Sequence, residues 1–121
     1  MSPAVWLGVA ALGGVGALLR FFVDGVIAAR AEGEFPIGTF VVNVTGAATL
    51  GLLAGLALTG DALVLAGTAL LGSYTTFSTW MLETQRLVEE GALLTAAANA
   101  LVSLGVGLGA AALGRLIGAH L

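Results

Sequence analysis

The stretch Gly72-Ser-Tyr-Thr-Thr-Phe-Ser-Thr-Trp80 decides how this chain folds. It lies in an uncharged segment, Ala62–Leu82, about as long as a helix must be to cross the hydrocarbon core of a bilayer. Its hydroxyl and β-branched side chains, with a glycine at its start, are unlike a plain lipid-facing helix. Non-helical backbone is tolerated at membrane depth only where protein or a water-filled cavity satisfies its N–H and C=O groups. The stretch therefore predicts a membrane helix broken near Gly72–Thr76, buried between neighbouring helices, with backbone oxygens free to bind a ligand.

The composition agrees with a membrane protein. Of 121 residues, 59% are hydrophobic and 9% are charged, whereas a soluble domain has about 25% charged residues. We therefore expect an all-α, multi-pass protein of the cell membrane whose solvent is the lipid bilayer. The net charge of -3 argues against a nucleic-acid partner, and the absence of cysteine excludes disulfides and thiolate metal sites.

Four apolar segments predict a single domain, 1–121, with four transmembrane helices. The spans are expected at about residues 3–23, 37–59, 62–82 and 92–113. A short turn at Gly60-Asp61 makes the middle two spans antiparallel neighbours. Glycines four residues apart predict close helix packing; they occur at Gly51/Gly55, Gly105/Gly109 and Gly114/Gly118.

Four crossings place both termini on one side of the membrane. Arg115 lies on that side, whereas Arg30, Arg86 and the nearby Arg20 lie on the opposite side. This arginine asymmetry is small, so it permits both orientations in one membrane.

Polar residues at membrane depth are few and are usually functional or bridge helices. Thr39, Asn43 and Gly46 follow helical spacing and fall on one face of the second span. The Asn43 amide is either a clamp between helices or an N–H donor for an anion path.

The fourth span repeats this pattern with Asn99, Ser103 and Gly107. Ser103 either lines a path or marks close packing, and Asn99 lies near enough to the membrane edge to be solvated. Similarly, Arg20 either attracts anions into a vestibule or pairs with Asp24, one turn further along the helix.

Phe77 and Trp80 are three residues apart and share a helix face beyond the break. Because an aromatic ring has a positive edge, two rings in edge-on orientation can attract a small anion. Packing is the commoner role of such rings, but the neighbouring hydroxyls favour an anion path.

Three motifs together resemble the Fluc (CrcB) family of fluoride channels. They are Gly13-Gly-Val-Gly-Ala-Leu-Leu-Arg20, Gly38-Thr-Phe-Val-Val-Asn-Val-Thr-Gly46 and the stretch Gly72–Trp80. The resemblance covers the whole chain, including its length and four-span layout. It implies an antiparallel, dual-topology homodimer with two pores that carry fluoride passively out of the cell. It also implies a structural sodium ion, held at the dimer centre by the backbone carbonyls of Gly72 and Thr75.

The resemblance assigns roles to further residues. The fluoride path would contain Asn43, Phe77, Trp80 and Ser103, with Thr39 and Thr79 as polar companions, and Arg20 would line a vestibule. Two positions depart from the family pattern. Trp80 stands where the family usually has phenylalanine and adds an indole N–H donor, and Gly107 stands where the family often has a hydroxyl.

Two other function classes are weighed against the channel. A four-span, proton-coupled multidrug exporter needs a glutamate embedded in the membrane, whereas Glu83 lies at the end of a span. A non-transporting scaffold subunit would release no fluoride from liposomes. An enzyme is not indicated, because the chain has no lysine and no phosphate-binding glycine loop.

Overall fold

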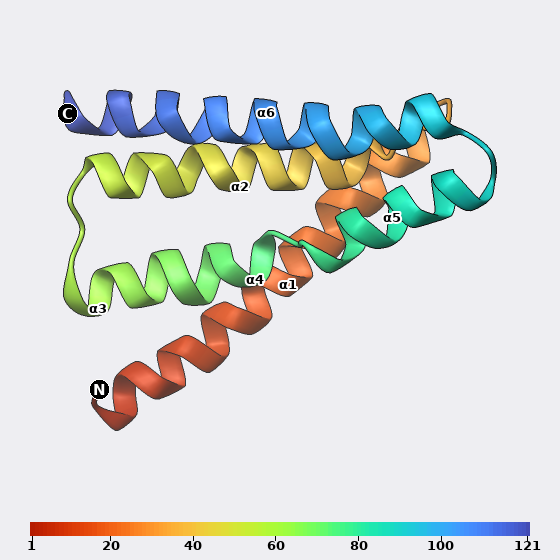
Figure 1. The fold of residues 1–121 in the computed structure, drawn as a ribbon. Coiled ribbons are helices and arrows are strands. Elements are labelled where there is room, and N and C mark those ends of the chain that lie inside the picture. The colour runs from red at the N-terminus through yellow and green to blue at the C-terminus, as the bar shows by residue number, and fades with distance from the viewer.

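The computed structural model describes the whole chain, residues 1–121, and is entirely helical (Figure 1). Its elements are α1 (Pro3–Arg30), α2 (Ile37–Gly55), α3 (Gly60–Leu63), the π-helical η1 (Val64–Leu71), α4 (Gly72–Tyr74), α5 (Ser78–Glu89) and α6 (Leu93–Ala119).

Three of these helices, α1, α2 and α6, are long and apolar enough to cross a membrane. The remaining crossing is made in two pieces. The continuous run α3–η1–α4 contains fifteen residues, Gly60–Tyr74, and would rise only about 22 Å as a helix. The chain is then non-helical at Thr75–Phe77, where Thr75 is extended with φ -79° and ψ 158°, before α5 begins. The break predicted near Gly72–Thr76 is therefore present.

The helices are arranged so that this break lies inside the bundle. In Figure 1, α2 and α6 run side by side in the same direction, and they form the most extensive helix pair. Helix α1 crosses the bundle obliquely and packs on η1, α4 and α2, whereas α5 packs on α6. Both termini lie at the same end of the bundle as the α2–α3 connection, as the sequence predicts.

Glycines allow α2 and α6 to approach closely. A Cβ atom on Gly51 would meet the Ala111 carbonyl, and one on Gly114 would meet the Ala48 carbonyl. The same is true of Gly55 and Gly118, so two of the three predicted small-residue motifs pack against each other. The third motif is different, because Gly105 and Gly109 have nothing within 4 Å of their Cβ positions.

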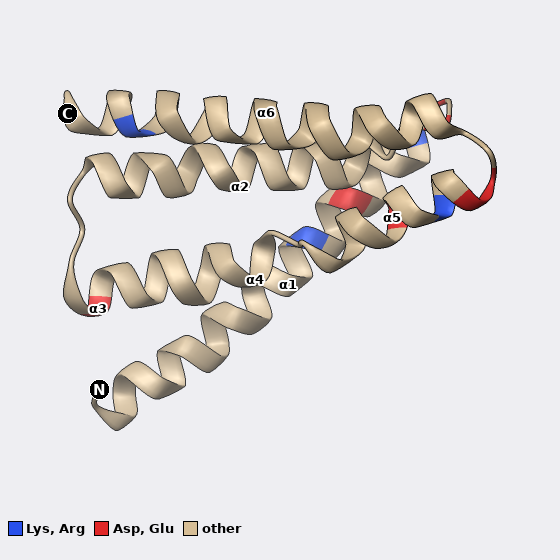
Figure 2. Cartoon of the chain, in the orientation of Figure 1, with Lys and Arg blue, Asp and Glu red and all other residues tan.

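The surface of the chain requires an apolar solvent. Only 15 of 121 residues are buried, and large hydrophobic side chains are exposed along the whole of α1 and α6. Charged positions lie on the middle of α1, on α5, in the connections and near the outer ends of α3 and α6, while α2 and η1 have none (Figure 2). Because an exposed apolar surface of this extent is incompatible with water, lipid must cover it.

Some boundaries differ from those expected. Helix α1 continues through Asp24 to Arg30 instead of ending near residue 23, because the charged Asp24 does not interrupt a helix and the first proline after it is Pro36. Helix α2 ends at Gly55, so residues 56–59 form the turn that was predicted at Gly60-Asp61. Helix α6 extends to Ala119 rather than ending near residue 113.

The glycine contacts make a testable prediction about stability. Gly114→Ala should destabilise the protein by about 1–3 kcal/mol, because its methyl group would overlap the α2 backbone. Gly25→Ala is the matched control, since its Cβ position is open, and it should be neutral or stabilising by up to about 1 kcal/mol. Thermal unfolding in detergent would compare them, and equal shifts for both variants would contradict the assignment.

Candidate functional site: the helix break and its two cavities

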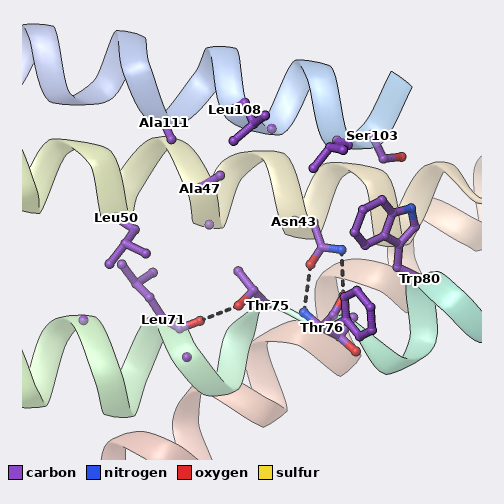
Figure 3. Close-up of a pocket in the computed structure, with 16 residues that line it drawn as sticks. Asn43, Ala47, Leu50, Leu71, Thr75, Thr76, Trp80, Ser103, Leu108 and Ala111 are labelled. Atoms are coloured by element: carbon purple, nitrogen blue, oxygen red, sulfur yellow. Dashed lines mark hydrogen bonds between the residues drawn. The ribbon is translucent and has the colours of Figure 1, made fainter. Parts of the chain in front are cut away.

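The break is held open by the side chain of Asn43 on α2. Asn43 Nδ2 donates to the Thr76 carbonyl oxygen at 2.8 Å, and the Thr76 backbone N–H donates to Asn43 Oδ1, also at 2.8 Å (Figure 3). The amide therefore takes the place of the helical partners of Thr76. Of the two roles considered for Asn43, the clamp between helices is observed.

A second side chain caps the start of α5. The Thr79 backbone N–H donates to Thr76 Oγ1 at 3.2 Å, as a backbone N–H does to a capping hydroxyl in the first turn of many helices. Thr76 thus contributes its backbone to one side of the break and its hydroxyl to the other.

These two hydrogen bonds leave two carbonyl groups without partners. In an uninterrupted helix, the Thr76 N–H would donate to Gly72 and the Thr79 N–H would donate to Thr75. Both donors are instead bound to side chains, and the carbonyl oxygens of Gly72 and Thr75 accept no hydrogen bond. They are the two oxygens that the family resemblance assigns to sodium. Unpaired backbone oxygens at membrane depth fit a hard cation, as in sites built from carbonyl groups.

Close contact between α2 and the break depends on Gly46. A Cβ atom there would overlap the Thr75 methyl group. On the same helix, Thr45 Oγ1 lies 3.0 Å from the Tyr74 hydroxyl, and the two form a hydrogen bond. Helix α2 therefore fixes both the last residue of α4 and the first residues of the break.

One cavity, of about 360 Å³, lies between the break, α2 and α6 (Figure 3). It brings together six of the residues predicted from the sequence. These are Asn43, Gly72, Thr75, Phe77, Trp80 and Ser103. The wall also contains Gly107, so the position where the family often has a hydroxyl faces this space.

The two aromatic rings meet edge to face at the end of this cavity. Their centroids are 5.7 Å apart and their planes are inclined by 89°. Phe77 is 69% exposed, so its ring is accessible from outside the chain. The indole N–H of Trp80 donates to the Asn99 backbone carbonyl at 2.8 Å. The donor that tryptophan adds at this position is therefore occupied by α6.

A second cavity, of about 230 Å³, lies on the α1 side of the break. Its wall includes Arg20, Asp24, Thr39, Thr76 and Thr79. Thr39 therefore does not share the Asn43 cavity, although the two residues lie one turn apart on α2. Arg20 and Asp24 form no ion pair within 4.0 Å, and both side chains line this cavity.

The structure also corrects the expectation for Asn99. Its side chain is 1% exposed and is fully bonded within the protein, so it is not solvated at a membrane edge. Ser103 is 8% exposed and donates a long hydrogen bond of 3.4 Å to Asn99 Oδ1.

Two residues were missed as parts of the site. Thr76 lines both cavities and forms both hydrogen-bonded connections of the break; its position three residues before Thr79 is the capping signal that could have identified it. Glu83 lies beside Thr39 and near Asp24, and one of its carboxylate oxygens is buried without a partner. Only the tertiary contacts reveal Glu83.

The sequence was also compared with known proteins. Residues 7–115 match the family model described as CrcB-like protein, Camphor Resistance (CrcB). The chain belongs to the CrcB family. It is 62% identical to the fluoride-specific ion channel FluC 2 of Mycolicibacterium paratuberculosis, over 94% of this chain and 93% of that protein. It is 56% identical to FluC 2 of Mycobacterium bovis, over 97% and 93% of the two chains. It is 50% identical to FluC 1 of Streptomyces avermitilis, over 88% and 89%.

The clamp in this CrcB protein can be tested by Asn43→Asp. A carboxylate retains an acceptor for the Thr76 N–H but cannot donate to the Thr76 carbonyl. We expect a loss of about 1–3 kcal/mol, the usual cost of leaving a part-buried polar group unsatisfied. Thr49→Val, at an exposed position of the same helix, should change stability by less than about 0.5 kcal/mol. Thermal unfolding in detergent measures both, and a stable Asn43→Asp protein would contradict the clamp.

Proposed function

We propose that this protein is a fluoride-selective channel through which the anion moves passively out of the cell. The observation that carries the proposal is the helix break, which places an aromatic pair and the Asn43 amide on the wall of one cavity. The CrcB family membership and the names of the relatives support the same function. The protein is a multi-pass membrane protein and not an enzyme.

The cavity offers a small anion several weak positive contacts. The edges of the Phe77 and Trp80 rings carry partial positive charge. Asn43 uses one of its two amide N–H groups on Thr76, and the structure gives the other no partner, so it remains available as a donor. Ser103 lies on the α6 side of the cavity, and its one O–H would have to leave the long 3.4 Å hydrogen bond to Asn99 to reach the anion. Such contacts suit a small anion because larger ones cannot approach several groups at once.

The second cavity would serve as the vestibule. The Arg20 guanidinium is its one positive side chain and would raise the local anion concentration. Thr39 and Thr79 provide hydroxyl groups between this vestibule and the ring pair. Once at the rings, fluoride needs no energy source other than its gradient and the membrane potential, which supplies about 2.3 kcal/mol per charge for each 100 mV.

The unpaired carbonyls of Gly72 and Thr75 would hold a structural sodium ion. These oxygens lie at membrane depth and accept no hydrogen bonds. The positive charge of a bound sodium ion would stabilise them in place of the missing donors. Two oxygens are fewer than a hard cation usually takes from a protein. A second copy of the chain would provide the remaining pair, so the site requires a homodimer.

The dimer we propose is antiparallel. The apolar cavity beside the break opens at the surface of a single chain, and Gly107 on its wall has nothing packed against its Cβ position. A second copy inserted in the opposite orientation would cover it and form two equivalent anion paths. The small arginine asymmetry permits this dual topology.

A proton-coupled multidrug exporter remains the alternative in a different class. It requires an acidic residue that titrates at membrane depth, and the candidates beside the second cavity are Asp24, on its wall, and Glu83, next to Thr39. Loss of transport in Glu83→Gln together with normal transport in Phe77→Ile would favour the exporter.

The channel proposal is tested by fluoride efflux from liposomes clamped with a potassium ionophore. Wild-type protein should release fluoride but retain chloride. Phe77→Ile should slow release by about tenfold or more, because an aliphatic side chain lacks the positive ring edge. Phe22→Ile is the matched control, at a position of α1 that is 66% exposed and outside both cavities, and should release fluoride normally. No release by the wild type would refute the channel and favour a scaffold role.

The cation proposal is tested separately by thermal stability in sodium and in a large organic cation. Sodium should raise the Tm of the wild type, because a ligand that binds only the folded state stabilises it. Thr76→Val should reduce this increase, because the Thr79 N–H loses its capping hydroxyl and the break that presents the Thr75 carbonyl becomes less firmly held. Ser78→Ala, a neighbouring hydroxyl that caps no backbone group, should keep the increase. A sodium effect that persists undiminished in Thr76→Val would contradict the assigned ligands.

A further inference from the structure

A closed circuit of hydrogen bonds joins α5 to α6 beside the aromatic pair. Trp80 Nε1 donates to the Asn99 carbonyl oxygen at 2.8 Å. In return, Asn99 Nδ2 donates to the Trp80 carbonyl oxygen at 3.3 Å and to Thr84 Oγ1 at 2.8 Å. Thr84 Oγ1 itself donates to the Trp80 carbonyl oxygen at 2.9 Å. Each of Trp80 and Asn99 therefore binds the main chain of the other through its side chain.

This circuit satisfies every polar atom of the Asn99 side chain. Its two N–H groups have acceptors, and its oxygen accepts from Ser103 at 3.4 Å. The single donor of the Trp80 indole is also occupied. Because Asn99 is 1% exposed, breaking any of these bonds would leave a buried polar group unpaired. Neither Asn99 nor the indole N–H therefore has a donor to spare for an anion.

The circuit has a geometric consequence for the ring pair. The position of a tryptophan ring depends on two side-chain torsions, and a hydrogen bond from Nε1 to a fixed acceptor restrains both of them. The Trp80 ring is held at 89° to that of Phe77, with centroids 5.7 Å apart. A phenylalanine at position 80 would have no N–H and could not be held in this way.

We propose that Asn99 is a positioning residue for the anion path, acting through Trp80. It fixes the orientation of the indole ring, and thereby sets the rate at which fluoride passes the ring pair, without touching the anion itself. This inference rests on the proposed channel function. It assigns to a buried asparagine of α6 a role that is specific to a tryptophan at position 80.

The first measurement follows the indole N–H directly. Trp6→Phe leaves Trp80 as the only tryptophan of the two in the chain, so nitrogen-15 NMR of the protein in detergent shows a single indole N–H signal. Its hydrogen exchange should be slow in this parent protein. Asn99→Leu and Thr84→Val should each accelerate it about 2- to 10-fold, the effect of losing a typical hydrogen bond. Thr95→Val, the same chemical change at a half-exposed position of α6 outside the circuit, should not.

The second measurement is fluoride efflux from liposomes in two backgrounds. With Trp80 present, Asn99→Leu and Thr84→Val should slow efflux about 2- to 10-fold. In the Trp80→Phe protein the same substitutions should change efflux by less than about twofold, since there is no indole N–H to position. Using both substitutions keeps the test decisive if one of them fails to fold.

The outcomes separate this inference from the channel proposal. Equal slowing in both backgrounds, or unchanged exchange of the indole N–H in both variants, would overturn the positioning role and leave the channel intact. A parent protein that retains a protected indole N–H but releases no fluoride would overturn the proposed function, and this inference with it.

Discussion

The structure depends on the paired hydrogen bonds between Asn43 and the backbone of Thr76. A bilayer provides no water to satisfy an open N–H or C=O group, and each such group costs several kcal/mol. A membrane helix can therefore be interrupted only where another group takes over its hydrogen bonds. A primary amide is suited to this task because it presents a donor and an acceptor side by side, as a peptide group does.

This one interruption creates two electrostatic environments close together. On the α4 side, the Gly72 and Thr75 carbonyls lie where a helix ends and its dipole is negative; on the α5 side, Phe77 and Trp80 lie where a helix begins and its dipole is positive. The first environment suits a cation and the second suits an anion. A continuous helix would offer neither, because its carbonyl groups would all be paired.

Helix packing holds the break in place. Glycines on α2 and on α6 allow these two helices to pack closely. Each of the two helices then contributes one asparagine that contacts the third crossing. Asn43 fixes the break itself, whereas Asn99 fixes the start of α5 through Trp80. The cavity beside the break, with the unpacked Gly107 on its wall, remains open at the surface of the single chain.

The sequence by itself determined the membrane class, the four crossings and the break in the third. These depend on apolar run lengths and on local residues such as the hydroxyl-rich stretch after Gly72, which act over a few neighbouring positions. Only the tertiary structure decided which group each polar side chain meets. The partner of Asn43 is 33 residues away and that of the Trp80 indole is 19 residues away. Local spacing could place Thr39 and Asn43 on one face of α2, but the neighbouring helices place them in different cavities. Helix packing, and not distance along the sequence, decides which groups lie close enough to form these contacts.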